Sequence, residues 1–81
     1  MAVFDDVKAI LIEQLAVKPE MVKLEAKLTD DLGADSLDAA EIVNTLEERF
    51  EISIADQDAA TAISVGDVVE LVNQKLQGKT A

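Results

Sequence analysis

The sequence has no cysteine and no histidine among its 81 residues, and it has one proline, no tryptophan and no tyrosine. Without cysteine and histidine the chain forms no disulfide, lacks the usual ligands of zinc and haem, and has no Cys–His or Ser–His pair for nucleophilic catalysis. Only a lysine could activate a serine, and the lysines follow no recognisable motif. We therefore expect a protein that is not an enzyme and that holds no metal.

Positive charge and long apolar runs are also scarce. Seven Lys and Arg against 17 Asp and Glu give a formal net charge of −10, so neither nucleic acid nor an anionic membrane surface is an expected partner. No apolar run approaches the roughly 20 residues of a membrane-spanning helix, and the first residues lack the pattern of a signal peptide. We expect a cytoplasmic protein without stable membrane insertion, whose partners are basic.

Apolar residues, in contrast, are plentiful, at 49% of the chain, which excludes a disordered acidic tail. The length suits one domain, here residues 1–81. Three segments show the three- and four-residue spacing of a helix with one buried face. Their apolar positions are Phe4, Val7, Ile10, Leu11 and Leu15 in the first, Ile42, Val43, Leu46 and Phe50 in the second, and Val65, Val68, Val69, Leu71, Val72 and Leu76 in the third.

Signals at the helix ends complete the predicted fold. Ser64 with Asp67 resembles a capping box, and Asp56 can cap a short helix that runs to about Ala62. The only alternating segment, residues 52–54, is too short for a sheet. The sequence predicts an all-α fold: a small four-helix bundle of three long helices and one short one. A long first loop, about residues 16–35, should be held to the core by Val22, Leu24, Leu28 and Leu32.

The negative charge is concentrated in one part of the chain. Residues 30–51 carry eight acids against Arg49, a net charge of −7, whereas residues 1–29 and 52–81 carry −1 and −2. Asp38, Glu41 and Glu48 are spaced to share one helix face. A solvated surface would explain a charge run of this kind. Repulsion concentrated in one element costs stability, however, which favours a cationic partner for this face.

At the start of the acidic helix lies Ser36, which the sequence places at or beside the N-cap. Gly33 allows a tight turn before the helix. A phosphate ester on the Ser36 hydroxyl would meet unpaired backbone N–H groups and the positive end of the helix dipole. An isolated serine at such a position would simply cap the helix.

The surroundings of Ser36 resemble a known family. The segment Gly33-Ala34-Asp35-Ser36-Leu37-Asp38 is similar to the attachment motif of the acyl carrier proteins, whose Asp-Ser-Leu serine carries 4′-phosphopantetheine. Residues 15–20, 46–52 and 65–72 resemble other blocks of that family at matching spacing. The chain departs from the common pattern at Ala40, Asn44, Ala55, Ala60-Thr61 and Ala62-Ile63.

The resemblance implies a function of the fatty-acid-synthesis type. Ser36 would receive the arm from coenzyme A through a pantetheinyl transferase, and the thiol of the arm would carry growing acyl chains as thioesters. Those chains could fold back between the helices. The resemblance also implies a monomer whose second helix is bound by basic patches on the transferase and on fatty-acid-synthesis enzymes. The implied contact residues are Asp35, Leu37, Asp38, Glu41, Glu47 and Glu48.

Three alternatives compete with this interpretation. A carrier dedicated to a polyketide or other specialised acyl pathway is one, because the short helix departs from the common pattern at Ala60-Thr61. An interaction bundle with an unmodified serine would share the composition and the fold. A calcium-binding loop over residues 30–41 fits poorly, because Leu32 and Ala34 occupy ligand positions and Asp35 stands where glycine is needed.

Overall fold

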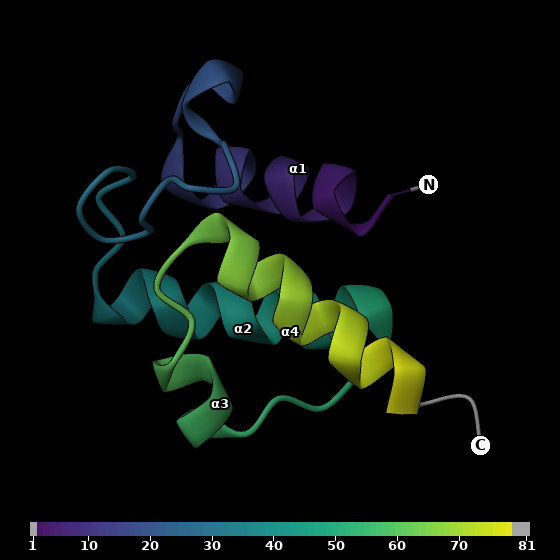
Figure 1. Ribbon diagram of the computed structural model, residues 1–81. Coiled ribbons are helices and arrows are strands. Elements are labelled where there is room, and N and C mark those ends of the chain that lie inside the picture. The colour runs from purple at the N-terminus through teal and green to yellow at the C-terminus, as the bar shows by residue number, and fades with distance from the viewer. Residues whose placement is uncertain (1, 79–81) are drawn as a thin grey trace.

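The computed structural model describes residues 2–78, and in this part of the chain the fold is entirely helical (Figure 1). The prediction of three long helices and one short one is confirmed. No β-strand forms within these residues, and an isolated bridge joins Lys27 and Ser64. The elements in chain order are α1 (Val3–Leu15), the 3-10 helix η1 (Pro19–Met21), α2 (Ser36–Phe50), α3 (Asp56–Ala60) and α4 (Val65–Gly78).

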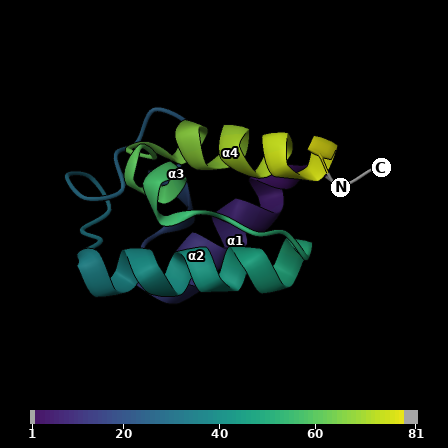
Figure 2. The ribbon, with the colours of Figure 1, turned by 90° about the horizontal axis from the view of Figure 1, so that it is seen from below.

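The core lies where α1 meets α2 and α4, and it consists of small aliphatic side chains. Val7, Leu11, Val65 and Val72 are fully buried at its centre. These residues belong to the helix faces that the spacing predicted, because residues three and four apart lie on the same side of a helix. Figure 2 shows α3 and the segment before it between α2 and α4. The short helix therefore closes one side of the bundle.

The long first loop is held partly as predicted. Val22 and Leu32 are buried and Leu28 is partly buried, but Leu24 is 52% exposed, so its side chain does not hold the loop. Its backbone does: the Leu24 carbonyl accepts a hydrogen bond of 2.8 Å from the Gly66 N–H. The loop is thus joined to the start of α4 by main-chain contacts, which residue types do not reveal.

The short helix α3 differs from its prediction at both ends. Asp56 does not cap it: the N-cap is Ala55, without a side-chain hydrogen bond, and Asp56 is the first helical residue. The helix ends at Ala60, earlier than expected. Beyond it, Ala62 packs against the core while Ile63 is 61% exposed. The smaller residue faces inward because the chain has already left the helical period at this point.

The start of α4 confirms the predicted capping box. The Asp67 N–H donates to Ser64 Oγ at 3.2 Å, and the Ser64 and Ile63 N–H groups donate to Asp67 Oδ2 at 3.1 and 3.0 Å. The Ser64 N–H, then the Ile63 N–H, lower the pKa of the Asp67 carboxyl from its ordinary 3.8. Both hydrogen bonds favour the charged form.

This lowered pKa predicts how stability depends on pH. Because the folded chain holds the Asp67 proton less tightly than the unfolded chain, the stability from this carboxylate is full above the ordinary pKa of 3.8 and is lost as pH falls through the lowered value. An Asp67→Asn variant should have a lower urea midpoint of unfolding than the parent at pH 7. The difference between the two midpoints should become smaller below about pH 4. An equal pH dependence in the exposed control Asp30→Asn would contradict this.

Candidate functional site

A tight turn sets the entry into α2. The N–H groups of Asp31 and Leu32 donate to the Lys27 carbonyl at 2.9 and 3.1 Å, and the Gly33 N–H donates to the Thr29 carbonyl at 3.1 Å. Gly33 has a φ of +75°, in the left-handed region that glycine adopts without strain. The role predicted for Gly33 is therefore confirmed. The turn directs the chain into the helix with Ser36 at its first residue.

Asp35, not Ser36, caps the helix. Asp35 Oδ1 accepts the Asp38 N–H at 2.9 Å, and Asp38 Oδ2 accepts the Asp35 N–H at 3.2 Å, which is a complete capping box. The expectation that Ser36 lies at or beside the N-cap is thus confirmed: it lies directly after the cap. The sequence did contain the signal: an acidic residue lies three positions after Asp35, whereas Ala39 lies three positions after Ser36.

As the first residue of α2, Ser36 is exposed and its hydroxyl has no assigned partner among residues 2–78. The Ser36 and Leu37 N–H groups come before the first hydrogen bond inside the helix. The Asp35 carboxylate also lies at this end of the helix, where the dipole is positive. Ser36 is therefore accessible to another enzyme.

This arrangement predicts unequal effects for two neighbouring substitutions. Asp35→Ala removes the cap and should lower the free energy of unfolding by about 0.5–2 kcal/mol. Ser36→Ala removes no hydrogen bond of the described chain and should change it by less. Urea unfolding at neutral pH measures both, and equal losses in the two variants would contradict the assignment of the cap.

The six residues predicted to contact partners fall into two groups. Leu37 is 75% exposed, and Glu41 and Glu48 are exposed with no side-chain partner in the described chain. Asp35 and Asp38 are engaged in the capping box. The residues without such an internal contact, Leu37, Glu41 and Glu48, form what we call the α2 contact face.

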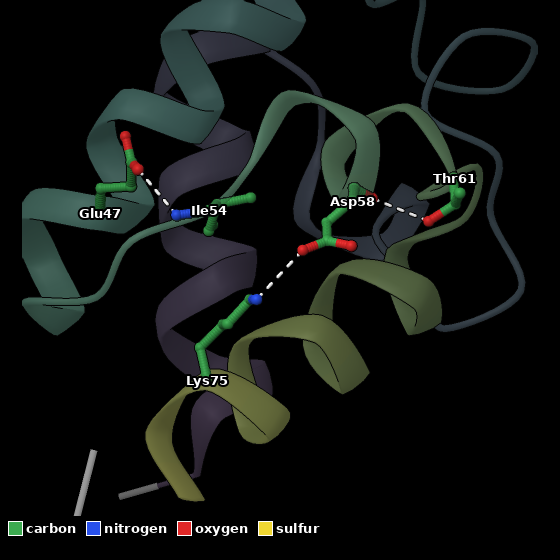
Figure 3. Close-up of polar contacts among 5 residues, drawn as sticks. All are labelled: Glu47, Ile54, Asp58, Thr61 and Lys75. Carbon is green, nitrogen blue, oxygen red and sulfur yellow. Dashed lines mark hydrogen bonds and ion pairs between the residues drawn. The ribbon is translucent and has the colours of Figure 1, made fainter. Parts of the chain in front are cut away.

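Glu47 has an internal contact that the sequence did not predict. Its Oε2 accepts the Ile54 N–H at 2.8 Å in a partly buried position (Figure 3). The contact joins α2 to the segment that leads into α3. Two further contacts in Figure 3 hold α3 itself: Lys75 Nζ lies 3.0 Å from Asp58 Oδ2, and Thr61 Oγ1 donates to the Asp58 carbonyl at 2.8 Å. The short helix α3 and the segment before it are thus attached to both α2 and α4.

A cavity of about 540 Å³ lies between α2, α3 and α4, and Ser36 is one of its lining residues. Volumes of about 300–1,000 Å³ are usual for small-molecule sites, which are mostly apolar with a few polar groups. The lining matches that description, with Thr29, Ser36, Asn44, Glu47 and Asp56 as its polar members. The apolar members include Leu28, Ala34, Ala39, Ala40, Ile42, Val43, Leu46, Ile54, Ala59, Ala60, Ala62, Val68 and Leu71.

Metal sites and membrane-spanning helices are both absent from residues 2–78. No three or more acidic side chains in this range come together so that they could hold a metal ion. None of its helices has the length and apolar character needed to cross a membrane.

Comparisons with known proteins identify the family of this chain. The family model described as "Phosphopantetheine attachment site" matches residues 5–72. An acyl carrier protein of Campylobacter curvus is 54% identical over 74 residues, covering 91% of this chain and 96% of that protein. One from Wolinella succinogenes is 54% identical over 72 residues, covering 89% and 95%.

A solved structure agrees with the sequence comparisons. A protein from Mycobacterium tuberculosis, assigned as an acyl carrier protein, is 32% identical and superposes with a TM-score of 0.85, covering 90% of this chain and 97% of that one. The family model, over residues 5–72, includes part or all of each of the four helices, together with the turn and the serine at the start of α2. The chain belongs to the acyl carrier proteins, which are non-catalytic carriers that hold phosphopantetheine.

Proposed function

We propose that the Ser36 hydroxyl carries the 4′-phosphopantetheine arm and that the loaded protein delivers growing acyl chains to the enzymes of fatty acid synthesis. In the loading step, Ser36 Oγ forms a bond to the phosphorus of coenzyme A that joins the arm. The bond from that phosphorus to adenosine bisphosphate breaks, and a base of the transferase takes the hydroxyl proton. The bound arm supplies the thiol that this cysteine-free chain lacks.

The position of Ser36 carries the proposal. Its hydroxyl is exposed at the first residue of α2, directly after the Gly33 turn, and it lies inside the segment matched by the family model. The free N–H groups of the first turn suit a phosphate oxygen. The missing histidine fits a serine that is modified by another enzyme instead of acting as a nucleophile in its own site.

The cavity beside Ser36 suits the acyl chain. It begins at the attachment residue and extends between α2, α3 and α4, where Ile42, Leu46 and Val68 are buried. Burial of methylene groups there is favourable by about 0.8 kcal/mol each. A chain tethered at Ser36 can therefore fold back into the bundle and leave it again when a partner enzyme binds.

The α2 contact face supports recognition by basic partners. Leu37 offers an apolar contact beside the attachment point, and Glu41 and Glu48 offer unpaired charge. Exposed ion pairs are worth only about 0–1 kcal/mol each, so this face should orient brief encounters and then release them. Asp35, Asp38 and Glu47 add to the field while they keep their internal hydrogen bonds. We further propose that the protein works as a cytoplasmic monomer.

One measurement tests the attachment. Incubation with coenzyme A and a transferase of broad specificity should raise the intact mass by one arm, and peptide mapping should place that arm on Ser36. An unchanged mass would leave an interaction bundle with an unmodified serine.

A second candidate function, a carrier for a polyketide or another specialised acyl pathway, is favoured by the polar Asn44 in the cavity wall.

A further inference from the structure

Asn44 is a polar side chain in the wall of the cavity whose amide has no partner in the described chain. It lies two four-residue steps after Ser36 on the same side of α2, with Ala40 between them. Ala60 lines the same cavity from α3. Asn44 is exposed, and its amide can donate and accept hydrogen bonds.

The lining of the cavity is unequal in polarity. Ile42, Leu46, Ile54 and Val68 are buried, with at most 6% exposure, and form an apolar interior. The exposed members include Asn44 and Asp56. A ligand that suits this lining has an apolar length and a polar substituent that can reach the exposed edge.

The type of polar group narrows the choice of substituent. Glu47 and Asp56 also line the cavity and are carboxylates, so a negatively charged substituent would be repelled. Glu47 already accepts the Ile54 N–H. Asn44 is neutral and can donate to a keto oxygen or accept from a hydroxyl. A saturated chain beside Asn44 would displace water from its amide without replacing the hydrogen bonds.

From these observations we propose that the cavity prefers acyl chains with a hydroxyl or keto oxygen over saturated chains of the same length, and that the Asn44 amide makes the discriminating hydrogen bond. The proposal rests on the attachment of the arm to Ser36. It adds a specificity residue and a class of cargo to that function.

The test compares tethered chains on one protein. Ser36 is loaded with arms that carry octanoyl, octanoyl with a hydroxyl at carbon 3, 5 or 7, or octanoyl with a keto group at one of those carbons, each through an amide that resists hydrolysis. The rise in melting temperature over the bare arm reports how fully the chain occupies the cavity. At least one oxygenated chain should occupy the cavity about tenfold more favourably than octanoyl.

Substitution of Asn44 identifies the residue responsible. Asn44→Leu should remove or reverse the preference. Asn44→Ala should also remove it, and this smaller side chain serves as the test if leucine disturbs the fold. The matched control is Asn73→Leu on α4, because Asn73 is exposed and does not line the cavity. The control should keep the preference.

Each other result has a distinct meaning. Occupancy by octanoyl equal to or above that of every oxygenated chain overturns the preference and leaves the carrier function intact. A preference that survives in both Asn44 variants overturns the role of Asn44. If Ser36 accepts no arm, as the intact mass would show, both the proposed function and this inference fail.

Discussion

Replacing Ser36 with alanine is expected to abolish attachment of the arm completely while the protein keeps its fold. The hydroxyl oxygen is the atom that forms the phosphodiester, and an alanine offers no substitute. The same change removes no cap, since Asp35 performs that role. After incubation with coenzyme A and the transferase, the intact mass of Ser36→Ala should stay that of the bare chain, and its urea midpoint should stay close to the parent value.

A second serine provides the matched control. Ser53 is exposed in the segment between α2 and α3, outside the turn that precedes Ser36. Ser53→Ala should accept the arm at the parent rate. Retained loading of Ser36→Ala, or lost loading of Ser53→Ala, would show that the attachment residue has been misassigned.

The helices were predictable because they depend on local spacing. The apolar residues of α1, α2 and α4 repeat at the period of a helix, and burial of those faces sets the packing of the bundle. Local pairs were predictable for the same reason, as the Ser64–Asp67 capping box shows. At the start of α2 the spacing left the cap open between two adjacent residues, Asp35 and Ser36, and Asp35 is the cap. The partner at the third helical position decides between them.

Contacts between distant segments were not predictable. The hydrogen bond from the Ile54 N–H to Glu47 depends on how the chain returns after α2, which spacing does not encode. The exposed Leu24 and Ile63 show the same limit, because main-chain contacts fix both segments: the Leu24 carbonyl accepts from Gly66, and the Ile63 carbonyl accepts from Leu28 at 2.9 Å. The cavity walls likewise come from α2, α3, α4 and the segments between helices, so spacing along the chain does not show that Asn44 lines a cavity.

The division of the acidic residues determines how partner recognition should be tested. Reversing the charge of Asp38 would break the capping box, and reversing that of Glu47 would remove the acceptor of the Ile54 N–H. Either change would therefore alter the stability of the fold as well as recognition by partners. Glu41 and Glu48 have no such contacts. A double variant, Glu41→Lys with Glu48→Lys, therefore changes the α2 contact face and little else.

This double variant should slow loading by the transferase by about tenfold or more at low salt, because electrostatic steering of this kind raises association rates by about 10–10³-fold. The effect should shrink as salt rises and screens the exposed charges. The quantity to measure is kcat/KM for arm attachment at several ionic strengths, with urea unfolding as a check on the fold.

Net charge alone must be separated from the position of the charges. Glu13→Lys with Glu20→Lys makes the same change from −10 to −6, since each substitution adds two charges, but places it on α1 and η1. If recognition depends on the α2 contact face, this control should load much faster than the α2 variant at low salt. Equal rates in the two variants would mean that partners respond to the overall charge of the protein and that α2 has no special part in their approach.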